Sequence, residues 1–208
     1  LPSQQNTRKR VVIGRDGRIS GNLISDLVSS TLISLGIDVI DLGLSTTPTV
    51  EMAVTALNAD GGIILTASHN PKEWNALKLL NNKGEFISGE EGKKILDIAA
   101  TESYVFADID KLGMKCEDHS MLTEHIKTIV NHPLVDQKAI MQANISVVVD
   151  AINSTGAMAV PQLLEALGVK KVQVINSEMN GNFAHNPEPL PEHLTALSQA
   201  VVAHGAHL

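Results

Sequence analysis

A serine at position 68 stands among side chains that could support phosphoryl transfer. His69 and Asn70 follow Ser68 directly, and two ammonium groups come soon after, at Lys72 and Lys78. A serine hydroxyl accepts a phosphoryl group when its loop is fixed, cations lie around it and a base takes its proton. The proline after Asn70 restricts the backbone, the lysines supply positive charge, and His69 or Lys78 could act as the base.

Two further cations precede this serine. Arg15 and Arg18 lie in one short loop with Asp16 and a glycine. Guanidinium and ammonium groups are the usual partners of phosphate oxygens in proteins. We therefore expect Arg15, Arg18, Asn70 and Lys72 to surround a bound phosphate.

The same residues have a second interpretation that needs no chemistry. Serine and asparagine are common in the loop after a strand, because their side chains bond to nearby backbone N–H groups. Spacing alone does not separate such a loop from a phosphoryl-transfer site, so both interpretations stay open at this point.

Apolar runs before these loops predict buried strands, and apolar residues at helical spacing predict helices between them. The predicted strands are residues 11–14, 37–42, 61–65, 76–80, 145–149 and 171–175. The predicted helices are residues 20–35, 47–57, 88–100, 121–130, 157–167 and 191–203, and residues 101–112 are expected to be a connection. This order predicts an α/β fold with a mixed, mostly parallel sheet sandwiched by helices. Ligands of such sheets bind at the carboxyl ends of the strands.

A second strand, loop, helix and strand begin near residue 144, which predicts two domains, residues 1–139 and 140–208. Local signals add detail. Ser20 and Thr47 are predicted helix N-caps, and Leu23 and Leu27 belong to the apolar residues of the first helix. Trp74 could stack on a sugar, but we expect it to pack the serine loop against the domain.

The composition limits the kinds of partner. The chain has a formal net charge of −7 over 208 residues, and no run of Lys or Arg exceeds three residues, which argues against nucleic acid. The longest apolar runs are far below the ~20 residues of a membrane span. The single cysteine, Cys116, excludes an internal disulfide and fits a reducing compartment. We therefore expect a cytoplasmic protein without nucleic-acid or membrane partners.

Several segments resemble one known family. Residues 66–71, Thr-Ala-Ser-His-Asn-Pro, and residues 74–78, Trp-Asn-Ala-Leu-Lys, resemble the active-site serine loop of the phosphohexomutases. This family includes phosphoglucomutase, phosphomannomutase and phosphoglucosamine mutase. Other matches, in the right order, are the Gly-Arg-Asp loop at 14–21, the Thr-Pro turn at 47–49 and the segment 181–189, which is similar to the end of the family's second domain.

The resemblance implies a mechanism. Ser68 carries a phosphoryl group in the resting enzyme, gives it to a hexose 1-phosphate or 6-phosphate, and takes the other phosphoryl group back from the hexose 1,6-bisphosphate. His69 and Lys78 match positions near the reacting hydroxyls, and either could be the general acid/base. Family members hold Mg²⁺ with an oxygen of the phosphoserine and a loop of aspartates, which makes Ser68 the expected metal ligand in this chain.

The chain departs from the family in two places. Residues 1–10 do not match the family's glycine-rich opening segment, and the aspartate loop is expected only after the last residue. The resemblance thus implies the first one and a half domains of a four-domain mutase, inactive by itself. Phosphoglucosamine mutase is the alternative within the family, and a non-catalytic phosphosugar-binding module is the alternative from another class. A nucleotide-binding domain has little support, because neither glycine-rich nucleotide motif occurs.

Overall fold

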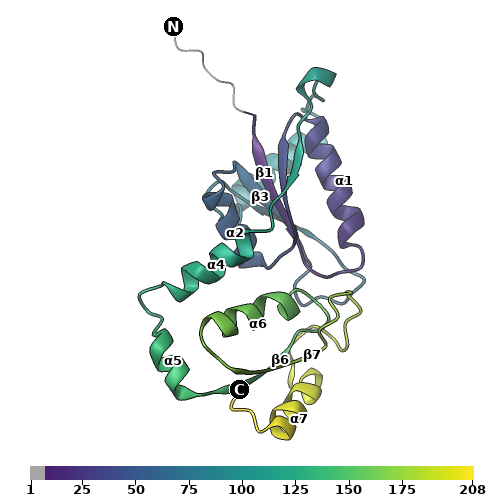
Figure 1. Cartoon of the computed structure of the whole chain (residues 1–208). Helices are drawn as coiled ribbons and strands as arrows, with labels where there is room; N and C mark the ends of the chain where they lie inside the picture. Colours follow the sequence, from purple (N-terminus) through teal and green to yellow (C-terminus); the bar gives the residue numbers. More distant parts are fainter. Residues whose placement is uncertain (1–7) are drawn as a thin grey trace.

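The computed structural model describes residues 8–208, and its larger sheet has the strand order β4-β3-β1-β2-β5 (Figure 1). The strands are β1 (Arg10–Arg15), β2 (Asp38–Leu44), β3 (Gly61–Leu65), β4 (Leu77–Leu80) and β5 (Lys115–Glu117). Neighbouring strands run parallel except β3 and β4, which are antiparallel. The predicted mixed and mostly parallel sheet is therefore confirmed.

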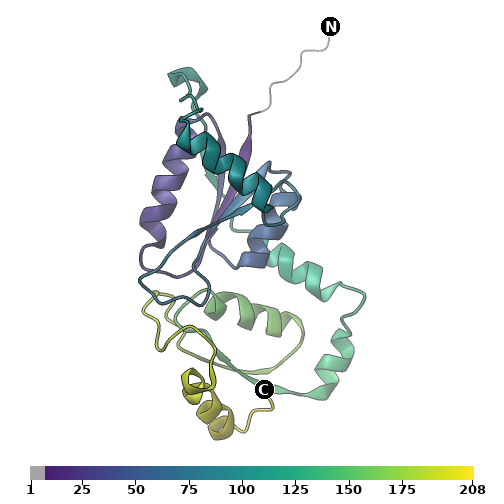
Figure 2. The same cartoon turned by 180° about the vertical axis from the view of Figure 1, so that it is seen from behind.

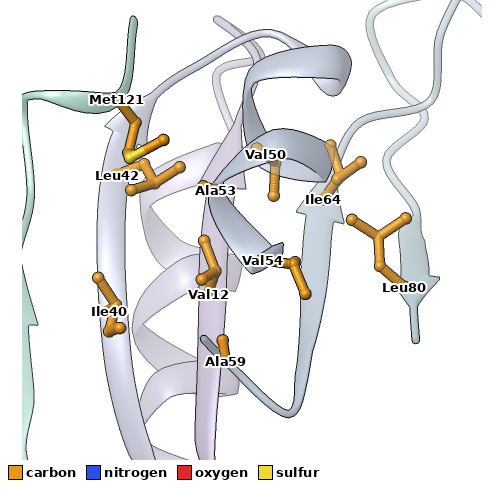
Figure 3. Close-up of a cluster of buried hydrophobic side chains, with 10 residues drawn as sticks. All are labelled: Val12, Ile40, Leu42, Val50, Ala53, Val54, Ala59, Ile64, Leu80 and Met121. Atoms are coloured by element: carbon orange, nitrogen blue, oxygen red, sulfur yellow. The ribbon is translucent and has the colours of Figure 1, made fainter. Parts of the chain in front are cut away.

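Helix α1 (Gly21–Ser34) covers one face of this sheet and α2 (Thr47–Ala56) covers the other. Successive residues of a strand point to opposite faces, so each central strand contributes to two cores. The core on the α2 side, drawn in Figure 3, consists of Val12, Ile40, Leu42, Val50, Ala53, Val54, Ala59, Ile64, Leu80 and Met121. The buried residues of the core on the α1 side are Ile13, Val39 and Leu65.

Helix α1 lies on the sheet with part of the face that its apolar spacing predicted, because Ile24, Val28 and Leu32 pack against the core. Leu23 and Leu27 are 65% and 60% exposed, whereas Ser25 and Ser29 are buried. Small side chains let the helix approach the strands closely, and the apolar contacts come from partly buried neighbours such as Ile24. The sequence shows two adjacent apolar stripes, and only the packing decides which of them is covered.

The N-cap position of α1 is Ser20, as predicted, whereas that of α2 lies one residue earlier than predicted. The cap of α2 is Thr46, whose side chain accepts from the Thr49 N–H, so Thr47 is already helical. Ser20 precedes α1, but its hydroxyl makes no capping bond and accepts instead from Asn75 Nδ2 at 3.0 Å. This contact ties the start of α1 to the serine loop, 55 residues further along the chain.

Helix α3 (Gly89–Ala100) is seen best from behind the sheet (Figure 2). It buries none of its residues and begins with a capping box between Ser88 and Glu91. The expected connection at 101–112 contains a short 3-10 helix, η1 (Ile109–Lys111). Strand β5 was not predicted, because its three residues are all exposed and have no apolar alternation.

A second unit follows two helices, α4 (Met121–Val130) and α5 (Gln137–Ala143), of which α5 was not predicted. Its parallel strands β6 (Ser146–Asp150) and β7 (Lys171–Ile175) are joined by α6 (Gly156–Ala166), and η2 (Pro191–His193) and α7 (Thr195–His204) come last. Helix α4 contacts both α2 and α6. The domain boundary at 139/140 lies inside α5 and stays a prediction. None of the helices within residues 8–208 combines the length and apolar character needed to cross a membrane.

Candidate active site

The serine loop, residues 66–76, joins β3 to β4. Ser68 is exposed, and its φ of +53° lies in the left-handed region. A residue other than glycine keeps this conformation only where its surroundings hold it. The Ser68 N–H donates to Thr66 Oγ1 at 3.1 Å, and the side-chain amide of Asn70 donates to the Ala67 carbonyl at 2.8 Å. The loop therefore presents the Ser68 hydroxyl to solvent in a defined position.

Lys78 lies against this hydroxyl, with its Nζ 2.5 Å from Ser68 Oγ. The reason is the antiparallel turn, since β4 runs back along β3 and brings Lys78 level with Ile64. The same ammonium group is 5.9 Å from the centre of the Phe86 ring, within the range of a cation–π contact. Lys78 can thus donate to the serine oxygen, or take its proton when the amine is neutral.

Arg18 does not face a ligand, which corrects its expected place around a bound phosphate. Its side chain is fully buried, and Nε pairs with Asp16 Oδ2 at 3.1 Å. The remaining N–H groups donate to backbone carbonyls of the serine loop, those of Ser68, Asn70, Pro71 and Trp74. A guanidinium has five N–H donors, and all of them are used here inside the protein.

Arg15 lies on the α1 side of the sheet. Its Nη1 donates to the Asp16 carbonyl at 3.3 Å, and its side chain lines a pocket of about 260 Å³ together with Asp41 and Lys115. Lys115 is paired with Asp41 at 2.8 Å, and this hydrogen bond raises the pKa of the lysine despite its partial burial. The expected place of Arg15 around a phosphate stays a prediction.

The other predicted residues lie on the loop surface. His69, Asn70 and Lys72 are exposed. Asn70 serves the loop itself through its bond to Ala67, whereas His69 and Lys72 make no side-chain hydrogen bond to any residue in the described part of the chain. Trp74 is 64% exposed, so it does not pack into the domain as expected.

The loops after β1, β2, β3 and β6 meet around one pocket of about 380 Å³. Its lining includes Asp16, Thr46 and Thr66 from the first unit and Asp150 and Ser154 from the second. This placement agrees with the expectation that the ligand-binding loops gather at the carboxyl ends of the strands. Asp16 and Thr66 border both this pocket and the serine loop.

Asp150 is held in place by its own unit. Burial would raise its pKa, but hydrogen bonds from Asn176, the Ile152 N–H and His185 hold the pKa below its ordinary value. His185 Nε2 lies 2.9 Å from Asp150 Oδ2. The carboxylate therefore carries a negative charge whose acceptor sites are occupied by the protein, and it orders the loop after β6.

Where their loops meet in Figure 1, the two units touch through backbone groups, the Ser154 side chain and one aromatic ring. The Gly17 N–H donates to Ser154 Oγ at 3.0 Å. A Cβ at Gly181 would overlap the Gly17 carbonyl oxygen, so the two segments pass very close. The ring of Phe183 lies 5.1 Å from the Arg18 guanidinium carbon.

Sequence reasoning missed three residues of this site, Asp16 and Thr66 as hydrogen-bonding partners of the loop and Phe183 as a contact from the second unit. Thr66 had a usable signal, because it is a polar residue placed directly after a buried strand. Phe183 lies in the segment 181–189 that resembles the family, but no local pattern marks its contact with Arg18, which exists only in the folded structure.

An exposed serine hydroxyl in a rigid loop, held against a lysine at the edge of an α/β sheet, is what a serine-based phosphoryl-transfer protein requires. The family models of phosphoglucomutase/phosphomannomutase α/β/α domain I and domain II match residues 1–105 and 123–208. The chain belongs to this family, and the resemblance found in the sequence is confirmed.

Individual relatives agree with this assignment. A phosphoglucomutase/phosphomannomutase of Thermococcus kodakarensis is 39% identical over 99% of this chain and 44% of its own length. A phosphoglucosamine/phosphogalactosamine mutase of Sulfurisphaera tokodaii is 33% identical over 92% of the chain and 42% of its own. The crystal structure of a family member from Burkholderia thailandensis superposes with a TM-score of 0.77 at 26% identity, over 95% of this chain and 43% of that one. The chain thus spans less than half the length of these proteins.

Proposed function

We propose that the protein to which this chain belongs is a phosphohexose mutase. It moves a phosphoryl group between the 1 and 6 positions of a hexose phosphate, with Ser68 as the carrier and a hexose 1,6-bisphosphate as the intermediate. The observation that carries the proposal is the contact of Lys78 with an exposed, conformationally fixed Ser68 in a chain of this family. A cytoplasmic location stays a prediction from the sequence.

In the chemical step, Ser68, Lys78 and His69 each have a defined role. When phosphorylated Ser68 reacts, its P–O bond breaks and a new P–O bond forms to a sugar hydroxyl oxygen. The Lys78 ammonium donates a proton to the departing Ser68 oxygen, and a second base, for which we propose His69, takes the proton of the sugar hydroxyl. In the return step the neutral Lys78 takes the Ser68 proton as the serine attacks the other phosphoryl group of the bisphosphate, and the protonated His69 gives its proton to the departing sugar oxygen.

Mg²⁺ is the cofactor implied by the resemblance, and it would neutralise charge on the transferring oxygens. Among residues 8–208, no three His, Cys, Asp or Glu side chains are grouped to hold a metal ion. An oxygen of phosphorylated Ser68 is the ligand that we propose from this chain. The roles given above are those of protein side chains, and none of them is derived from the metal ion.

The sugar is open between two candidates. The relative from Sulfurisphaera tokodaii is named for glucosamine and galactosamine phosphates, whereas the one from Thermococcus kodakarensis is named for glucose and mannose phosphates. The chain is more similar in sequence to the relative from Thermococcus kodakarensis, which favours glucose or mannose phosphate as the substrate. Comparing turnover of glucose 1-phosphate, mannose 1-phosphate and glucosamine 1-phosphate by the intact protein distinguishes the candidates.

The Ser68→Ala substitution tests the function most directly. Intact-mass spectrometry of the wild-type protein after incubation with glucose 1,6-bisphosphate should show one added phosphate, and the alanine variant should show none. Turnover should fall by at least about three orders of magnitude, because the group that carries the phosphoryl is lost.

Ser30→Ala is the matched control, because Ser30 is exposed on α1, away from the loop. It should keep both the added phosphate and the turnover. A wild-type protein that binds the bisphosphate but never gains a phosphate would instead support the non-catalytic phosphosugar-binding module.

A further inference from the structure

A continuous set of hydrogen bonds leads from Asp16 to the backbone of Ser68. Thr66 Oγ1 donates to Asp16 Oδ2 at 2.6 Å and accepts from the Ser68 N–H at 3.1 Å. Asp16 Oδ1 also accepts from the Arg18 N–H at 3.0 Å, which holds the carboxylate in its own turn. The threonine hydroxyl therefore connects a fixed carboxylate to the residue with the left-handed backbone.

Arg18 holds the rest of the same loop. Its Nη1 donates to the carbonyls of Pro71 and Trp74, both at 2.8 Å. Its Nη2 donates to the carbonyls of Ser68 at 2.8 Å and Asn70 at 2.9 Å. Four backbone carbonyls thus converge on one planar group, whose fork of donors has a fixed geometry. An ammonium group with three donors cannot reproduce this set.

Burial makes this arrangement sensitive to change. The Arg18 side chain has no exposed surface, and its charge is balanced by Asp16. Buried polar groups that lose a partner are costly, so the loop carbonyls and the guanidinium depend on each other. The serine loop is therefore held from the inside of the protein by one charged residue.

The second unit touches the same guanidinium. Phe183 places its ring 5.1 Å from the Arg18 guanidinium carbon, on a segment that begins with the close contact of Gly181 with Gly17. A ring at this distance favours a cation near its face. Docking of residues 181–183 therefore acts on the residue that holds the serine loop.

We propose that Arg18, Asp16 and Thr66 form a positioning unit that aims Ser68 Oγ at Lys78, and that Phe183 makes this aim depend on the docking of the second unit. The proposal rests on the proposed function, in which Ser68 carries the phosphoryl group. These residues do not touch the substrate. They act through the backbone of the loop, where a displacement of about 1 Å can change a rate by about a hundredfold.

The pair Thr66→Val and Thr66→Ser tests this unit in the intact protein. Valine keeps the shape of threonine but removes the hydroxyl between Asp16 and Ser68, whereas serine keeps the hydroxyl. Thr66→Val should lower kcat by roughly 10-fold to 100-fold with KM nearly unchanged, and Thr66→Ser should return kcat to within about threefold of wild type. The control is Thr55→Val, on an exposed turn of α2, which should leave kcat unchanged.

Amide hydrogen exchange of residues 66–76 gives a second readout that does not use the mutase reaction. Exchange should accelerate in Thr66→Val and, to a smaller extent, in Phe183→Leu, and stay slow in Thr66→Ser and Thr55→Val. A wild-type protein without mutase activity would contradict the proposed function alone, because amide exchange of residues 66–76 would still show whether Thr66 positions the loop. A folded Thr66→Val protein with wild-type kcat and wild-type exchange would overturn the positioning unit.

Discussion

At the scale of single residues, two lysines that look alike in the sequence have different surroundings in the structure. Lys78 contacts Ser68 Oγ and lies near the Phe86 ring, whereas Lys72 is exposed on the loop surface. Both are cations within reach of a phosphate by spacing alone. Only Lys78 has the geometry to exchange a proton with the serine oxygen.

We expect Lys78→Gln to slow phosphorylation of Ser68 by about a hundredfold to ten-thousandfold, the usual contribution of a positioned acid or base. Lys72→Gln should have a smaller effect, within roughly tenfold, because it removes charge without removing the proton carrier. Single-turnover transfer from glucose 1,6-bisphosphate, followed by intact mass, measures both. Lys83→Gln, in the exposed turn after β4, is the control. If Lys72→Gln slowed phosphoryl transfer more than Lys78→Gln did, the assignment of Lys78 as the proton carrier would be wrong.

At the scale of elements, α2 and α4 are joined by one polar contact within an apolar groove. Thr49 Oγ1 and His125 Nδ1 are 2.9 Å apart, and the groove between α2, α4 and α6 is lined by residues such as Leu122, Ile126 and Leu163. Burial lowers the pKa of His125 below its ordinary value of 6.5. The folded protein therefore binds a proton at this ring less readily than the unfolded chain does.

This shift predicts a loss of stability on acidification. As the pH falls below 6.5, the unfolded chain takes up a proton first, so the free energy of unfolding decreases until the folded ring also titrates. His125→Asn keeps a polar atom near Thr49 and removes the titration. Urea unfolding at several pH values between about 5 and 8 should show a flatter profile for His125→Asn than for wild type. A His125 variant with the wild-type slope would contradict the assignment.

At the scale of the whole molecule, the two units meet at a close backbone contact. Gly181 has a φ of +72°, and a side chain there would meet the Gly17 carbonyl and the Ile19 N–H. Gly205, after α7, has a φ of +56°, but a Cβ added there would have no heavy atom within 4 Å. The two glycines thus share a left-handed backbone, and an added Cβ would meet the first unit at Gly181 but no atom at Gly205.

Gly205→Ala should lower the free energy of unfolding by about 1–2 kcal/mol, because a residue with a side chain is strained in the left-handed conformation. Gly181→Ala should lower the free energy of unfolding by more than this, because the added methyl group must also separate the second unit from the loop that carries Arg18. Urea unfolding monitored in both units compares the two variants. Equal costs would mean that residues 181–183 do not dock tightly on Gly17.

The sequence alone was sufficient for the features that depend on local pattern. The strand at 61–65 has the bounds that its apolar run predicted, and the position of Ser68 directly after it follows from the same run. The order of strands and helices was enough for the fold class, and the Thr-Ala-Ser-His-Asn-Pro segment was enough for the family. These inferences needed only neighbours within a few residues.

Only the tertiary structure decided which cation does what. Arg18 and Lys78 were both expected near the phosphate, but Arg18 is buried beneath the loop and Lys78 lies on the serine oxygen. The bonds that separate them join residues about 50 positions apart, such as Arg18 and Ser68. Sequence spacing does not reveal such pairs. They are brought together by the parallel pairing of β1 with β3 and by the antiparallel pairing of β4 with β3. The contact of Phe183 with Arg18 has the same origin, since it exists only once both units have folded and docked.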